Sequence, residues 1–176
     1  MSDKKVPHPG DIFGHEAANV ASVRALYPAQ FSGPFNNWGW PDGWHSIVLE
    51  VCAFAAHHRP ETRWLQIKEK YGSLRMYYAG GGFRVDLRAS EGLASALMPG
   101  RGAQPAAEFK DIVVRAEARS LKTCSLCGTH EEAARVERRS FCNWLITSCE
   151  RCVPVITEYR VTIRGPTGSD AGTPTA

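Results

Sequence analysis

The chain has 176 residues, with 21 Lys and Arg against 18 Asp and Glu, so its formal net charge is +3. Hydrophobic residues make up 43% and charged residues 22%, which is typical of a soluble globular protein and excludes collagen-like and wholly disordered chains. No apolar run is long enough for a membrane helix, and residues 1–15 lack the apolar run of a signal peptide. We therefore expect a cytoplasmic protein with one folded core. A surplus of three charges is too small to indicate nucleic-acid binding by itself.

The composition along the chain predicts four segments. Residues 1–15 are expected to form a flexible N-terminus, and residues 165–176, rich in Gly, Thr and Pro, a disordered tail. Residues 16–122 carry the helical and strand patterns of an α+β domain, and residues 123–164 the cysteine spacing of a zinc-ribbon-like module. Within the first domain, residues 16–27 favour a short helix.

An aromatic loop over residues 31–44 follows this first helix. Aromatic side chains this dense either fill a core beneath a long loop or act as the anchors of an interface, where Trp and Tyr dominate. The sequence leaves both interpretations open and favours the core. The aromatic residues of the loop are Phe31, Phe35, Trp38, Trp40 and Trp44.

The strongest helix pattern comes next. Asp42 is expected to cap this helix, and His57, His58 and Pro60 to end it, because cations suit a helix C-terminus and proline stops propagation. Apolar residues recur at helical spacing and predict one face directed at a core. This stripe consists of Trp44, Ile47, Val48, Val51, Cys52 and Ala55.

Residues 63–79 predict a β-hairpin with its turn near Tyr71-Gly72, because apolar and polar residues alternate on both sides of that turn. Lys68, Arg75 and Tyr77 are expected on the outward face of the hairpin. Together with Trp38 and Trp40 from the preceding loop, they resemble an aromatic anchor ringed by cations. The predicted partner-binding residues are therefore Trp38, Trp40, Lys68, Arg75 and Tyr77.

The segment after the hairpin has a weaker pattern. Residues 83–105 are rich in Gly, Ala and Pro and are expected to form a loop or insertion, with a short helix near Glu91–Leu97. Residues 106–121 predict a second strong helix. Its apolar side consists of Phe109, Ile112, Val113, Ala116 and Ser120.

Four of the six cysteines form two Cys-x-x-Cys pairs, Cys124/Cys127 and Cys149/Cys152. Each pair can direct both thiolates at one ion, and Gly128 lets the backbone leave the first pair in a conformation that a β-carbon would oppose. Two pairs supply the four sulfurs of a closed, structural Zn²⁺ site, with one ion per chain. A redox dithiol is disfavoured because a thioredoxin-type motif needs no second copy.

The segment between the cysteine pairs predicts the hairpin of a zinc ribbon, with strands at 134–138 and 141–147 and a turn at Arg139-Ser140. Cys142 and His130 remain alternative ligands, although each would need a less regular loop. Cys142 and Cys52 are interpreted as small buried hydrophobic residues.

The sequence offers no catalytic motif. His15-Glu16 and His130-Glu131 lack the second histidine of a zinc protease motif. His57, His58 and Asp42 are the residues from which a hydrolase site could be assembled, and helix capping is the simpler interpretation of the two histidines. We therefore expect no enzymatic activity and no catalytic residue.

Several motifs together resemble a family of small, uncharacterised proteins of bacteriophages and prophages. These motifs are WPDGWHSIVLEVC, LQIKEKYGSLRMYY, AEARSLKTCSLCG and NWLITSCERC, and the resemblance covers roughly residues 38–152. The family resemblance implies a Gly-Trp helix, a Lys-Glu-Lys-aromatic-Gly-x-Leu-Arg hairpin and a helix leading into the cysteines. The hairpin motif matches at Lys68, Glu69, Lys70, Tyr71, Gly72, Leu74 and Arg75, and the metal motif at the four paired cysteines.

The resulting hypothesis is an α+β protein in which two helices pack on a small antiparallel β-hairpin or sheet joined to a Cys₄ zinc ribbon. The resemblance implies a zinc-stabilised, non-enzymatic binding protein, located in the cytoplasm of the bacterial host. Its expected partner is a host macromolecule, preferably a protein, such as a defence system or nucleic-acid machine that it would inhibit. One alternative is a nucleic-acid-binding regulator using the ribbon and the basic hairpin, and a second is a nuclease or hydrolase.

Overall fold

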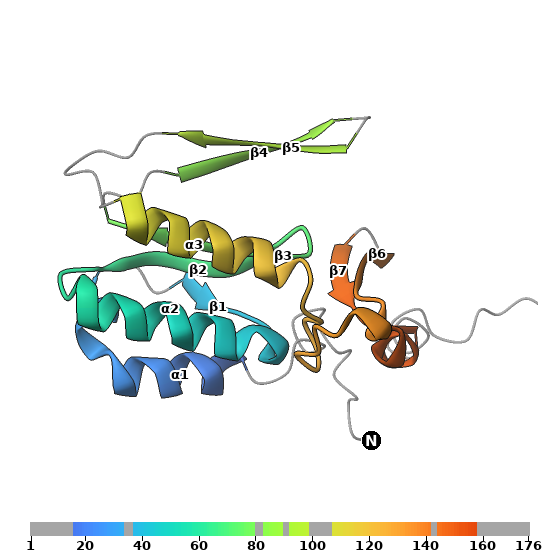
Figure 1. The fold of residues 1–176 in the computed structure, drawn as a ribbon, viewed down its shortest axis with the longest axis horizontal. Coiled ribbons are helices and arrows are strands. Elements are labelled where there is room, and N and C mark those ends of the chain that lie inside the picture. Colours follow the sequence, from blue (N-terminus) through green and yellow to red (C-terminus); the bar gives the residue numbers. More distant parts are fainter. Residues whose placement is uncertain are drawn as a thin grey trace, which may run out of the picture.

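The computed structural model describes residues 16–33, 37–79, 83–89, 92–98, 107–141 and 144–157. These residues form a mixed helical and strand structure (Figure 1), so the predicted α+β class is confirmed. The three longer helices are α1 (Glu16–Leu26), α2 (His45–His58) and α3 (Ala107–Ser120). The strands are β1 (Asn37–Gly39), β2 (Trp64–Lys70), β3 (Ser73–Tyr78), β4 (Phe83–Ala89), β5 (Gly92–Met98), β6 (Glu137–Phe141) and β7 (Trp144–Ser148).

The main sheet has the strand order β1-β2-β3, with β1 parallel and β3 antiparallel to the central strand β2. The predicted hairpin over residues 63–79 is confirmed. Its turn consists of Tyr71 and Gly72, whose φ angles are +54° and +75°. Two positive φ angles are the signature of the two-residue turn whose twist matches the flanking strands. Gly72 adopts this conformation at little cost, whereas Tyr71 carries some strain.

The helices build the core together with one face of this sheet (Figure 1). α2 contacts both α1 and α3, while α3 also contacts β3. Every residue of the predicted α2 stripe is buried, which confirms that helix face as core. The largest fully buried side chains include Trp40, Trp44, Trp64 and Phe109.

Buried polar groups in this core are paired within it. Gln30 donates from Nε2 to the carbonyl of Cys52 at 2.8 Å and accepts from Trp64 Nε1 at 2.9 Å. A buried amide without partners would cost free energy, so this pairing fixes the 3₁₀ helix Pro28–Phe31 against α2 and β2.

α3 lies along the outer edge of β3 and supplies hydrogen-bond acceptors to it. The amide of Leu74 donates to Ser120 Oγ at 2.9 Å, and the amide of Met76 donates to Glu117 Oε1 at 3.0 Å. These amides point away from β2, on the side of the strand that lacks a neighbour in the sheet. A helix that covers a sheet edge in this way prevents it from pairing with another chain.

The start of α2 differs from the prediction. The helix begins at His45, with Trp44 instead of Asp42 at the N-cap position. Asp42 opens a 3₁₀ turn over Asp42–Trp44, because the Gly43 amide bonds to Ser125 and the Trp44 amide to the carbonyl of Pro41. The Asp42 carboxylate accepts from Asn19 Nδ2 at 2.6 Å and thereby joins α1 to this turn.

The prediction of a loop with a short helix after the first hairpin was wrong for the described residues of that segment. β4 and β5 pair as an antiparallel hairpin, from Phe83 opposite Met98 to Ala89 opposite Gly92. Phe83, Val85 and Leu87 alternate with polar residues, which is the pattern of a strand. The loop prediction gave more weight to the high Gly and Ala content of the segment than to this alternation. Residues 92–97, expected to be helical, are strand.

The turn position in the second hairpin was also wrong. Arg139 and Ser140 lie within β6, opposite Ile146 and Leu145 of β7. Ile146 and Thr147 are buried, and their burial sets which residues of β6 lie opposite β7. The pairing therefore ends at Phe141 and Trp144, later in the chain than predicted. The predicted flexible terminus 1–15 and disordered tail 165–176 lie outside the described residues.

Candidate metal centre

The structure brings the four predicted cysteine ligands together. The Sγ atoms of Cys124, Cys127, Cys149 and Cys152 all lie within 4.8 Å of one another, and those of Cys127 and Cys149 are 3.7 Å apart. Four convergent sulfurs are a donor set that can hold one metal ion.

Backbone hydrogen bonds close both cysteine pairs into tight turns. In the first pair, the Gly128 amide donates to the carbonyl of Cys124 at 2.9 Å and the Cys124 amide to Thr129 at 2.8 Å. Gly128 has φ +74°, which confirms the reason for a glycine at this position. In the second pair, the Cys152 amide donates to the carbonyl of Cys149 at 3.1 Å.

The thiols of the cluster differ in acidity. Burial raises the pKa of Cys124, and burial together with neighbouring sulfurs raises that of Cys152. Burial also acts on Cys149, but hydrogen bonds from the Cys152 backbone and from nearby thiols outweigh it and lower its pKa to about 7. Four thiolates this close repel one another, so full ionisation needs a cation among them.

The metal centre is attached to the start of α2. The Gly43 amide donates to the carbonyl of Ser125 at 2.9 Å, and the Trp44 indole donates from Nε1 to the carbonyl of Thr123 at 2.9 Å. A Cβ atom at Gly43 would lie 2.0 Å from the carbonyl oxygen of Cys124. The backbone of the first cysteine turn therefore rests directly on the backbone of residues 42–44.

A second attachment joins the metal centre to the turn of the main hairpin. The Ser125 amide donates to the carbonyl of Thr147 at 2.8 Å, which ties the first cysteine turn to β7. The Thr147 hydroxyl in turn donates to the carbonyl of Gly72, and the Arg138 side chain packs beside Gly72. The centre is thus integrated with the α+β core at two points.

The alternative ligands are not part of the cluster as far as it is described. His130 is exposed and does not belong to the cysteine group. Cys142 lies outside the described residues. Cys52 is fully buried in the core, and burial raises the pKa of its thiol to about 12, in agreement with its interpretation as a small hydrophobic residue.

The predicted partner-binding residues do not form one exposed surface. Trp40 is fully buried, and Arg75 is only 4% exposed, so the prediction of an outward, accessible Arg75 was wrong. The Arg75 guanidinium donates to Ser73 Oγ at 2.5 Å and to the carbonyl of Leu74 at 3.0 Å. Alternation in the strand indicated the correct sheet face, but it could not show that this position is covered.

The other three predicted contacts are half-buried. Lys68 and Tyr77 lie on the same sheet face as Arg75. Trp38 packs edge-on against Phe31 at 5.0 Å, and the Arg24 guanidinium lies 5.2 Å from its ring centre. The core interpretation of the aromatic loop is therefore confirmed for Phe31, Trp40 and Trp44, while Phe35 lies outside the described residues.

The residues considered for a hydrolase site do not meet. Asp42 precedes α2, whereas His57 and His58 are its last two residues. A helix of 14 residues is about 20 Å long, so these groups cannot act on one substrate atom. His58 stacks on Phe54 with ring centres 4.3 Å apart, which gives it a packing role.

None of the helices in the described ranges has the length and hydropathy needed to cross a membrane. Comparison with known proteins gives no further assignment: no family model, no curated protein and no solved structure matches the chain.

Proposed function

We propose that this chain is a zinc-stabilised, non-enzymatic binding protein of phage or prophage type that engages a host macromolecule, preferably a protein. The observation that carries the proposal is the cluster of four cysteine sulfurs within 4.8 Å, held by backbone hydrogen bonds to the core. Four thiolates favour Zn²⁺, and a fully protein-ligated ion has no open position for a substrate or water. Its contribution would be free energy of folding, about 10 kcal/mol in isolated zinc-binding peptides.

The phage assignment rests on the resemblance of the hairpin and cysteine motifs. In the structure, the Lys-Glu-Lys-aromatic-Gly segment ends β2 and enters the turn, where the carbonyl of Gly72 accepts a hydrogen bond from Thr147 of β7. Leu74 of the same motif is buried in the core. Gly72 and Leu74 of the motif therefore support the fold. The binding role is implied by the resemblance, because small phage accessory proteins commonly act by binding a host protein.

Nucleic-acid binding has less support. Two arginines of the ribbon pair with glutamates, Arg135 with Glu150 at 3.2 Å and Arg139 with Glu137 at 3.4 Å. Arg75, one of the hairpin cations that the nucleic-acid alternative would use, is buried. Phosphate binding needs several accessible cations. The two ion pairs and the burial of Arg75 reduce the number of cations that could contact phosphates.

The proposal is tested by metal analysis together with capture of partners from a bacterial host lysate. We expect one zinc per chain in the purified protein and in Cys52→Ala, which leaves the cluster intact. Cys124→Ser and Cys149→Ser should lose the metal. Capture of a protein that persists after nuclease treatment supports protein binding, whereas capture that disappears with nuclease favours the nucleic-acid alternative. Folded wild-type protein without zinc would contradict the proposal.

A further inference from the structure

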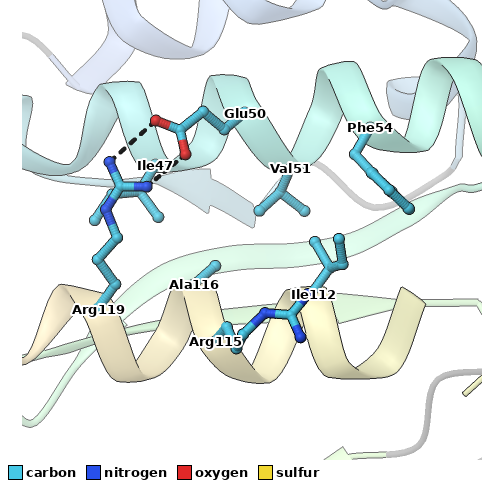
Figure 2. A pocket seen from close by; sticks show the side chains of 8 residues that line it. All are labelled: Ile47, Glu50, Val51, Phe54, Ile112, Arg115, Ala116 and Arg119. Atoms are coloured by element: carbon cyan, nitrogen blue, oxygen red, sulfur yellow. Dashed lines mark hydrogen bonds and ion pairs between the residues drawn. The ribbon is translucent and has the colours of Figure 1, made fainter. Parts of the chain in front are cut away.

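A groove with a volume of about 430 Å³ lies between α2 and α3. Figure 2 shows Ile47, Val51 and Phe54 of α2 facing Ile112 and Ala116 of α3 across it. Ala116 contributes only a methyl group to the α3 wall, which leaves room between the two helices. Apolar side chains therefore line both walls: Ile47 and Val51 are nearly fully buried, whereas Phe54 and Ile112 are half-buried.

The rim of this groove is charged and exposed. The Arg119 guanidinium binds both carboxylate oxygens of Glu50, and the bond from Nη2 measures 3.0 Å. This ion pair links the two helices and raises the pKa of Arg119 through its hydrogen bonds to Glu50. It neutralises two of the three charges that line the groove.

The third charge is Arg115, which is exposed on α3 and also lines the groove. Arg115 makes no hydrogen bond or ion pair with any other residue that the structure describes. The groove thus combines apolar walls with one net positive charge at its rim. A ligand that matches it needs large apolar side chains and a carboxylate beside them.

We propose that the α2–α3 groove is the docking site for an acidic amphipathic helix of the partner protein. Helices commonly bind by inserting apolar side chains, spaced one turn apart, into a trough between two helices. The groove has the volume of a few such side chains. Because its rim is exposed, the backbone of the bound helix would remain outside the groove. This inference rests on the proposed function, since it identifies the surface with which a binding protein would act.

The assignment is tested with a fluorescein-labelled peptide of about 18 residues, long enough to form a helix in a complex. Its Leu residues follow helical spacing and Glu residues flank them, and a second peptide has Lys in place of every Glu. We expect saturable binding of the Glu peptide, measured by fluorescence anisotropy, and much weaker binding of the Lys peptide. Arg115→Glu should weaken binding of the Glu peptide about 3- to 10-fold and strengthen that of the Lys peptide.

Lys110→Glu is the matched control, because Lys110 is exposed on the same helix and does not line the groove. It makes the same change in net charge and should leave both affinities nearly unchanged. The absence of saturable Glu-peptide binding, or an equal response of the two variants, would overturn the groove assignment. The same variants separate this inference from the proposed function. If Arg115→Glu retains zinc and still captures the lysate partner as well as Lys110→Glu does, only the groove assignment fails.

Discussion

At Gly43 the backbone of the core lies directly against the backbone of the first cysteine turn. A Cβ atom there would meet the carbonyl oxygen of Cys124 at 2.0 Å and the amide nitrogen of Gly128 at 2.7 Å. Both atoms belong to the backbone of the cysteine turn, so neither can move aside cheaply. The glycine is required by close approach of two backbones.

Gly43→Ala should therefore destabilise the protein by about 1–3 kcal/mol, the usual cost of overpacking. Separation of the two backbones would also stretch the 2.9 Å hydrogen bond from the Gly43 amide to Ser125. Urea unfolding measures the change, with Ser46→Ala as the control because Ser46 is exposed on α2. Equal unfolding midpoints for Gly43→Ala and Ser46→Ala would show that the close contact does not exist in solution.

The raised pKa of Cys52 predicts that the protein loses stability at alkaline pH. Burial raises its pKa from an ordinary value of 9.0 to about 12, so the folded thiol keeps its proton to higher pH than the unfolded thiol does. Its contribution to stability is complete below pH 9 and is lost as the pH rises to about 12.

In that interval the wild type should lose up to about 1.4 kcal/mol of unfolding free energy per pH unit more than Cys52→Ala does. Urea unfolding of both proteins at a series of pH values gives the difference, in which other titrating groups cancel. Parallel curves above pH 9 would mean that the Cys52 thiol is not held in an apolar environment.

At the scale of elements, α3 combines two roles that its sequence pattern shows only in part. Phe109 and Val113 pack in the core, as their helical spacing predicted. Ser120 and Glu117 accept hydrogen bonds from the free edge of β3, and the Ser120 hydroxyl also donates to the carbonyl of Glu117 at 2.6 Å. Polar residues on the buried side of α3 thus provide hydrogen-bond acceptors for backbone amides of β3.

Ser120→Ala should cost about 1–3 kcal/mol, because it leaves the buried amide of Leu74 without an acceptor. Hydrogen exchange at the Leu74 amide should accelerate more than exchange at Met76, which keeps Glu117. Ala118→Ser, on the exposed side of α3, is the control and should leave both amides protected. Unchanged exchange at Leu74 in Ser120→Ala would contradict the proposed edge contact.

The elements that could be predicted are those whose signal is local. The stripe from Trp44 to Ala55 repeats with the helical period, and Tyr71-Gly72 separates two alternating runs, so α2 and the first hairpin followed from the sequence. The parallel pairing of β1 with β2 could not be predicted. Trp38 lies opposite Ile67 in the sheet, but α2 separates the two residues in the sequence, so they meet only in the folded chain. Long-range pairing of this kind leaves no pattern within a short segment.

At the scale of the whole molecule, some features of the candidate site also follow from local sequence patterns, whereas others depend on long-range contacts. Two Cys-x-x-Cys pairs predicted the cluster of four cysteines, because their spacing limits how such thiols can converge. Its attachment to Gly43 and Gly72 could not be predicted, since each contact joins residues more than 70 positions apart. The groove between α2 and α3 was missed for a similar reason, because its shape depends on how two helices pack.

From the two attachments we predict that a metal ion bound by the four cysteines stabilises the α+β core as well as the cysteine turns. Trp44 is the reporter, since its side chain is fully buried in the core and its indole donates to the carbonyl of Thr123, immediately before the first cysteine. Removal of the metal by a strong chelator should lower the melting temperature sharply and shift tryptophan emission to longer wavelength, as this indole loses its partner and meets water. Added Zn²⁺ should reverse both changes. In Trp44→Phe the melting temperature should still fall on chelation, but the emission shift should be much smaller. If the chelated wild type melts as the metal-bound protein does, with unchanged emission, the cysteine cluster is not coupled to the core.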